Sequence, residues 1–427
     1  MKHASFVVAV FLLGSGCGPN PPAPVQVMAV APTQTGAYLT RQVTLRTITS
    51  MTALKGSIAE FTGGARIVFD GNDPLQQING GLVGQSEDQR FQSTVKDKGL
   101  DVRGNYIERA GVLWPADFDT WNMVTTYYNF EQSYAYFQGI NTGVDLPEIQ
   151  KMRVYYWPDV HFESANATTD NALFLSVIKS FIIVPQRAEQ TIPLAMNLGV
   201  IGHETAHKVF NHRVMNDEGI HPALVNWSLA PFNLLKSIDE GFADFHGYGV
   251  TCASDTGCRP QFLNVSISDT RATAVRDLSN SNACLTDSLK SSFTNSNPGT
   301  WVRSPDLYQV GNLFAAALYQ AGNQHSGLAG VTLMEHALLA SYNDNAPGSL
   351  GLSQLLNQNI ATSSAFTPEA VANAIAAHIS DDVLRKLWCN EITDRMDLAL
   401  CPSFPCSAMP KCPPSSQRGT VDACKKP

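Results

Sequence analysis

Charge is scarce in this sequence, and several features that would point to common functions are missing. Charged residues make up 15% of the 427 residues, and 29 basic against 37 acidic side chains leave a net charge of −8. A mildly acidic chain without a long run of like charge is a poor partner for nucleic acid, so we expect no nucleic-acid binding. No internal repeat is visible, and the 44% apolar content is typical of a globular chain.

Long hydrophobic runs are also absent beyond the N-terminus. No later stretch of roughly 18 residues is apolar and uncharged, so we expect no second membrane anchor. At the N-terminus, the positive charge of Lys2 precedes the apolar run Phe6–Leu13. This run is too short to span a bilayer and predicts a signal peptide.

The residues that follow this run are mostly small and end in a cysteine. The segment Leu13–Cys17 reads Leu-Gly-Ser-Gly-Cys and resembles a bacterial lipobox, although the leucine stands one place further from the cysteine than usual. The resemblance implies a secreted lipoprotein at the bacterial outer membrane or cell surface, attached to the membrane through a lipid on Cys17. An ordinary signal peptide cut near Gly16 is the alternative.

Cysteine usage supports an oxidising compartment. The chain has nine cysteines and no Cys-x-x-Cys pair of the kind that binds metals. Removing a lipidated Cys17 leaves eight, an even number, which predicts four disulfide bonds and no free thiol. Cys252 and Cys258 flank a tight turn and could pair locally. The sequence does not determine the other pairings or the oligomeric state.

The residue pattern changes along the chain and predicts an α+β protein. The alternation in Gln42–Ile48 indicates a strand, and the aromatic spacing in 119–139 indicates a core helix. We expect strands at 151–157 and 172–184 and a helix over about 193–210. The expected regions are a signal peptide at 1–17, a Pro-rich tether at 18–36, a β-rich N-terminal region at 37–115, a larger region at 116–388 that becomes mainly helical, and a Cys- and Pro-rich tail at 389–427.

A metal-binding motif lies inside the helix expected over 193–210. The segment His203–His207 reads His-Glu-Thr-Ala-His. Residues four apart share a helix face, so both imidazoles can reach one metal ion, with Glu204 beside them. Zinc bound in this way lowers the pKa of a water molecule, and the glutamate takes the proton as the water attacks a carbonyl. A surface helix that merely carries two histidines is the alternative.

A catalytic zinc ion usually has three protein ligands, so a third residue is needed. His212 stands five residues after His207 and points to another side of the helix, which disfavours it. Glu240 and Asp244 are four apart in a stretch with small residues, which would allow close packing against the first helix. We expect Glu240 as the third ligand and Asp244 as the acceptor of a histidine N–H. A capped acidic helix end is the alternative.

The two motifs together resemble the gluzincin metallopeptidases of the thermolysin and fungalysin type. The resemblance covers roughly 116–388, with Glu-Gly-x-x-Asp at 240–244 following the histidine motif. It implies a two-lobed α+β fold, with a β-rich N-terminal lobe, a mainly helical C-terminal lobe and the zinc helix at the cleft. The residues it implies are His203, His207 and Glu240 as zinc ligands, Glu204 as general base and Asp244 as the partner of His203.

Two upstream segments resemble the edge strand of that family, which pairs with the substrate backbone. We expect Asn166 and Ala167 to bind substrate, with Asn171 as the alternative residue. A third possibility is that neither asparagine binds substrate.

Downstream, Tyr308–Ala315 resembles a family segment that begins with a catalytic histidine, but a tyrosine stands in that place. A phenol can donate a hydrogen bond to an oxyanion, so we expect Tyr308 to assist catalysis. One alternative is that His325 or His336 reaches the site, and another is that Tyr308 is purely structural. Arg276 and Arg303 are candidates to support the part of the site beside Tyr308, and the alternative is that either is an ordinary surface or interdomain arginine.

The expected function is that of a zinc-dependent endopeptidase acting on peptide or protein substrates outside the cytoplasm. The rival is a surface lipoprotein that binds zinc but serves as a binding module with little or no activity. The absent histidine at Tyr308 favours the rival. Retention of Glu204 favours the enzyme, because zinc binding alone does not need that carboxylate.

Overall fold

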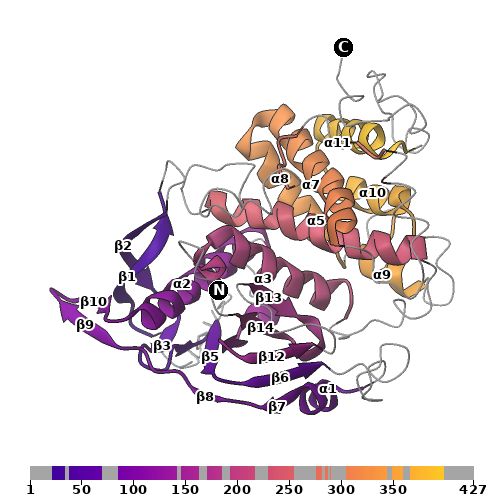
Figure 1. Cartoon of the computed structure of the whole chain (residues 1–427). Helices are drawn as coiled ribbons and strands as arrows, with labels where there is room; N and C mark the ends of the chain where they lie inside the picture. The colour runs from indigo at the N-terminus through magenta and orange to yellow at the C-terminus, as the bar shows by residue number, and fades with distance from the viewer. Residues whose placement is uncertain are drawn as a thin grey trace, which may run out of the picture.

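The computed structural model is mixed α+β, rich in sheet towards the N-terminus and mostly helical towards the C-terminus (Figure 1). This agrees with the fold class expected from the residue pattern. The structure describes residues 22–33, 38–69, 85–141, 146–162, 171–184, 193–216, 229–253, 276–280, 284–286, 289, 304–343, 349–358 and 366–398.

The described strands form three sheets. Their orders are β2-β1-β10-β9, then β13-β14-β11-β5-β4-β3 with β8 also paired to β5, and β12-β6-β7. Their bounds are β1 Val25–Pro32, β2 Tyr38–Leu45, β3 Ile48–Ser50, β4 Lys55–Gly56, β5 Ala59–Gly63, β6 Arg66–Phe69, β7 Val95–Asp97, β8 Leu100–Asp101, β9 Tyr106–Arg109, β10 Val112–Pro115, β11 Met152–Tyr156, β12 Asp159–Phe162, β13 Ala172–Leu175 and β14 Ser180–Ile183. In the second sheet β13 pairs antiparallel with β14 and stands at the edge of the described strands.

Helices cover the sheets and form the C-terminal part of the molecule (Figure 1). Their bounds are α1 Glu87–Thr94, α2 Phe118–Ile140, α3 Leu198–Arg213, α5 Leu229–Ala253, α7 Ser304–Ser326, α8 Leu328–Ser341, α9 Leu352–Gln358, α10 Pro368–Ala377 and α11 Asp382–Met396, with single 3-10 turns η1 Pro147–Ile149, η2 Ser176–Ile178 and η3 Leu194–Met196. No helix among them is both long and apolar enough to cross a membrane.

Helix α2 is the core helix expected from the aromatic spacing of 119–139. Its N-cap is Asp117, whose carboxylate accepts the backbone N–H of Thr120 at 2.7 Å. The aromatic side chains of Tyr127, Phe130 and Phe137 are fully buried in one apolar core that is shared with the sheets and the later helices. The first two sheets therefore share this core with the C-terminal helices, whereas the third sheet contributes Ile67, Val95 and Val160 to a smaller second cluster.

Two expected region boundaries are wrong. Residues 25–32 were expected in an extended tether, but they form β1, which pairs with β2 along its whole length. Val27, Ala29 and Ala31 are fully buried there. The tail was expected from residue 389, but α11 continues to Met396 and buries Cys389 in the core. The hydrophobic residues of both segments lie in the folded body.

The cysteines also differ in part from expectation. Cys252 and Cys284 are disulfide-bonded. Cys389 is a buried thiol, so the expectation that all cysteines other than Cys17 form disulfides is wrong at this residue. Cys17 and Cys258 lie outside the described residues.

Close helix crossings determine where the histidine helix lies. A Cβ atom at Gly202 of α3 would stand 2.9 Å from the side chain of Val250, so α3 and α5 approach closely beside His203. The small residues around Glu240 and Asp244 were expected to allow close packing against this first helix, but one of them, Gly241, faces α7 instead. A Cβ there would stand 2.1 Å from the carbonyl oxygen of Gly311. Glycines thus allow α5 to pack tightly between α3 and α7.

Candidate metal centre

Helix α3 carries the histidine motif and begins later than the expected residue 193. Its N-cap is Asn197, whose side-chain oxygen accepts the N–H groups of Gly199 at 2.8 Å and Val200 at 3.3 Å. The hydroxyl of Tyr38 on β2 also donates to this oxygen, at 3.2 Å. The start of the helix is therefore tied to the first sheet.

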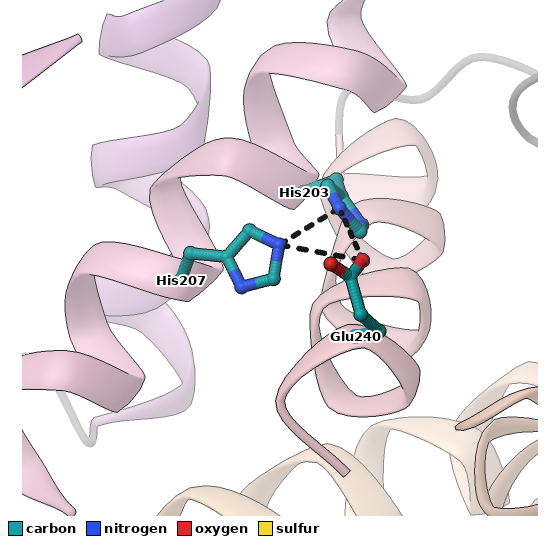
Figure 2. A group of neighbouring side chains, drawn as sticks. All are labelled: His203, His207 and Glu240. Atoms are coloured by element: carbon teal, nitrogen blue, oxygen red, sulfur yellow. Dashed lines mark hydrogen bonds and ion pairs between the residues drawn. The ribbon is translucent and has the colours of Figure 1, made fainter. Parts of the chain in front are cut away.

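Two histidines of α3 and one glutamate of α5 point toward one another (Figure 2). The Nε2 atoms of His203 and His207 are 3.0 Å apart. The Oε2 atom of Glu240 lies 3.4 Å from the first and 3.6 Å from the second. Ligands of a tetrahedral zinc ion, with bonds of about 2.0–2.1 Å, stand roughly 3.3 Å apart. The three donor atoms therefore form a triangle of the size that zinc requires, and the group could bind a metal ion.

The environment of the Glu240 carboxylate also supports metal binding. Its Oε2 atom is buried and has no well-formed hydrogen bond within the described structure. Its nearest cationic neighbours are the two imidazoles at 3.4 and 3.6 Å and a guanidinium nitrogen of Arg276 at 3.5 Å. Burial raises the pKa of Glu240, but the charges of His207 and His203 outweigh it and hold the pKa well below the ordinary value. A buried, ionised oxygen without a hydrogen bond is a natural metal ligand.

Each histidine has its own carboxylate on the far side of the ring. Asp244 lies 2.9 Å from Nδ1 of His203, and Asp239 lies 2.7 Å from Nδ1 of His207. A hydrogen bond at Nδ1 keeps the proton there and turns the lone pair of Nε2 toward the metal position. The sequence interpretation named Asp244 but missed Asp239.

These carboxylates also influence the protonation of the free site. Burial and the Arg276 charge lower the pKa of His203, but contacts with Asp244 and Glu240 leave it raised. Burial lowers the pKa of His207, and the Asp239 and Glu240 carboxylates raise it well above the ordinary value. Without metal, the excess negative charge of the site therefore favours bound protons.

Glu204 lies between the histidines and the edge strand β13. Its Oε1 atom is 4.0 Å from Nε2 of His203, and its Oε2 atom accepts the backbone N–H of Phe174 at 2.6 Å. Burial raises the pKa of Glu204, and the nearby histidines oppose that rise. The arrangement holds a carboxylate of raised basicity beside the metal position without making it one of the three donors.

Arg276 and Tyr308 stand on the other side of the cluster. The guanidinium of Arg276 donates to both carboxylate oxygens of Asp244, at 2.6 to 3.1 Å. One of its nitrogens is 3.2 Å from Nε2 of His203. The ring of Tyr308 lies under this guanidinium, 4.4 Å from centroid to Cζ. Tyr308 is therefore linked to the site through Arg276.

The structure places the remaining candidate histidines away from the cluster. His325 contacts Asp381, and His336 hydrogen-bonds the carbonyl oxygen of Ile140 at 2.7 Å. His212 lines a separate surface pocket. His246 is enclosed among aromatic side chains in the core.

The expected substrate residues can be placed only in part. Asn166, Ala167 and Arg303 lie outside the described residues. The alternative, Asn171, is exposed just before β13, and its side-chain oxygen accepts the N–H of Ala172 at 2.9 Å.

Comparisons with known proteins add little. No protein-family model and no curated protein sequence matches the chain. Among solved structures the chain is similar to the precursor of protealysin, a metalloproteinase from Serratia proteamaculans, at 13% identity and a TM-score of 0.42. The match covers 76% of this chain and 86% of that chain. So distant a similarity carries no argument about function, which rests on the site itself.

Proposed function

We propose that this protein is a zinc-dependent endopeptidase of the gluzincin type. The observation that carries the proposal is the convergence of His203, His207 and Glu240 on one point, with Glu204 beside them on the same helix. Bound zinc supplies Lewis acidity for a peptide carbonyl and for water. Imidazole and carboxylate donors with one open position are typical of catalytic zinc sites.

The residues around this point have separable roles. Glu204 takes a proton from the attacking water and returns it to the leaving amine. Asp244 and Asp239 keep both imidazoles in the tautomer that directs Nε2 inward. The phenol of Tyr308 and the guanidinium of Arg276 donate hydrogen bonds to the oxyanion that develops on the cleaved carbonyl.

Strand β13 aligns the substrate in this proposal. It stands at the edge of its sheet among the described strands, and Phe174 within it contacts the Glu204 carboxylate. An extended peptide that pairs with this edge passes directly beside the general base. The substrates are peptides or proteins outside the cytoplasm, where a lipid on Cys17 tethers the enzyme.

The rival function is a zinc-binding surface lipoprotein without turnover. Its support is Tyr308, which stands where the resembling family has a histidine. Glu204 argues against this rival. A structural zinc site does not need a further buried carboxylate of raised pKa beside its three protein ligands.

The first prediction separates the two functions. Glu204→Gln should leave the zinc content unchanged and lower the cleavage of a mixed peptide library by about 10²–10⁴-fold, because an amide cannot accept the proton. Metal analysis and peptide mass spectrometry, with and without chelator, measure both effects. Glu108→Gln, an exposed change on β9, is the matched control. Full zinc content with no cleavage by the wild type would support the rival, and unchanged turnover of Glu204→Gln would contradict the mechanism.

A further inference from the structure

The surface pocket that His212 lines lies beside the histidine helix α3, and most of its charged lining residues are basic. It encloses about 310 Å³. Its positively charged or titratable nitrogen groups belong to Lys151, Arg153, Lys179, Lys208 and His212. Its two carboxylates already have ion-pair partners, because Glu87 contacts Lys179 at 3.0 Å and Glu148 contacts Arg213 at 2.9 Å. The positive charge is local, since the whole chain has a net charge of −8.

The backbone supports a role for two of these lysines. Lys151 and Lys179 adopt left-handed conformations, with φ of +51° and +46°. Glycine or asparagine adopts this conformation at lower cost, whereas a lysine there costs of the order of 1 kcal/mol. Both lysines line the same pocket although one directly precedes β11 and the other directly precedes β14. Local strain at converging residues points to a use for their side chains.

Arg153, one of the residues that line this pocket, has a buried donor. Its guanidinium stacks on Phe91, with 4.4 Å between Cζ and the ring centroid. Its Nη1 atom is buried and has no hydrogen-bond partner in the described structure. A buried donor of a permanent cation without an acceptor is costly unless an anion reaches it.

The pocket adjoins the proposed reaction centre through α3 and β13. Lys208 stands four residues after Glu204, so the two side chains share a helix face about one turn apart. Phe174 joins them: its backbone N–H contacts the Glu204 carboxylate at 2.6 Å, and the Lys208 ammonium lies 5.6 Å from its ring centroid. A peptide on the β13 edge with its cleaved bond at Glu204 would bring a nearby residue to this pocket.

We propose that this pocket is a substrate subsite that binds a carboxylate of the peptide, which makes acidic peptides the preferred substrates. This inference rests on the proposed peptidase function, but what it predicts is the binding of a peptide, which can be measured without cleavage. The carboxylate belongs to an Asp or Glu side chain near the cleaved bond or to the C-terminus of the peptide. Both sources offer the same acceptor for the guanidinium and the ammonium groups.

The test measures binding separately from cleavage. Labelled eight-residue peptides with blocked ends, neutral except for one Glu moved through the positions, are titrated by anisotropy into the zinc-loaded Glu204→Gln protein. At the best position the Glu peptide should bind about 10- to 100-fold more tightly than its Gln counterpart, the worth of a hydrogen bond to a charged group. The second possible source, the peptide C-terminus, is tested by comparing a neutral peptide that has a free C-terminal carboxylate with the same peptide as its C-terminal amide. The preference should shrink with added salt.

Variants of Lys151 give the most direct test of the pocket, because this side chain is exposed and its change leaves the core intact. Lys151→Gln should reduce the Glu preference, and Lys151→Glu should reverse it in favour of a Lys peptide. Lys96→Gln, an exposed change on β7 outside the pocket, should have no effect.

The outcomes separate the two proposals. Equal affinities for Glu and Gln peptides at every position, and for free and amidated C-termini, overturn the subsite even if the wild type cleaves peptides. A Glu or C-terminal preference that depends on Lys151, with no cleavage by the wild type, supports the subsite and counts against the peptidase.

Discussion

At the scale of single residues, an aspartate of α5 supports each ligand histidine, Asp244 at His203 and Asp239 at His207. His203 and His207 could be assigned from sequence because four residues make one helical turn. Glu240 and Asp244 followed from the same rule and from the family resemblance. Asp239 was missed, although it stands next to Glu240, because its contact with His207 depends on how α5 crosses α3. The spacing of residues within one helix does not determine the angle at which two helices cross.

The second prediction tests Asp239. Asp239→Ala removes the acceptor at Nδ1 of His207, so the ring loses its fixed tautomer and some of its basicity. Zinc affinity, measured by competition with a chromophoric chelator, should fall by about 10- to 100-fold. Asp88→Ala, an exposed change in the first turn of α1, should leave it unchanged. Equal affinities for both variants would show that Asp239 does not support the metal site.

At the scale of elements, the sequence predicted segments whose pattern is local. The helix at 119–139 and the strand at 151–157 appear as α2 and β11. Strand β1 was mistaken for a tether because its Pro- and Ala-rich surroundings suggest an extended chain. Its burial comes from pairing with β2 and β10, and the second of these partners is far away in sequence. The contact of Gly241 with Gly311 on α7 was missed for the same reason.

The third prediction concerns the crossing of α5 and α7. A Cβ at Gly311 would stand 2.4 Å from the carbonyl oxygen of Ser237 and 2.8 Å from the amide nitrogen of Gly241, which are backbone atoms that cannot rotate away. Gly311→Ala should therefore lower the free energy of unfolding by about 1–3 kcal/mol in urea titrations. Zinc affinity should fall as well, since Glu240 adjoins the displaced backbone.

The control for this prediction is Gly139→Ala in α2. A Cβ at Gly139 meets nothing within 4 Å. Alanine is the better helix former, so this variant should gain about 0.5–1 kcal/mol. Similar stability changes for both variants would contradict the close-crossing explanation.

At the scale of the whole molecule, a buried polar group connects three helices behind the site. His246 of α5 lies 2.9 Å from the hydroxyl of Tyr136 on α2 and 3.1 Å from that of Tyr342 after α8. Glu335 of α8 is buried beside the same Tyr136 hydroxyl, and burial raises the pKa of Glu335 to about 8. Burial lowers the pKa of His246 to about 3, so both groups are neutral in the folded protein near pH 7. No residue pattern indicates this cluster, since its members are joined only by helix packing.

The last prediction is the pH dependence that Glu335 imposes on the fold. In the unfolded chain this carboxyl ionises near its ordinary pKa of 4.5, whereas in the fold it keeps its proton to about pH 8. Between these values the folded state binds more protons than the unfolded state, so stability falls as pH rises, by at most about 1.4 kcal/mol per pH unit. Glu335→Gln keeps a neutral side chain of the same shape and removes this slope. Thermal melts are measured with chelator present, so that zinc binding does not contribute. The Tm of Glu335→Gln minus the Tm of the wild type should increase from pH 5 to pH 8 and level off above pH 8. A difference that stays constant across this range would mean that Glu335 is ionised in the folded protein.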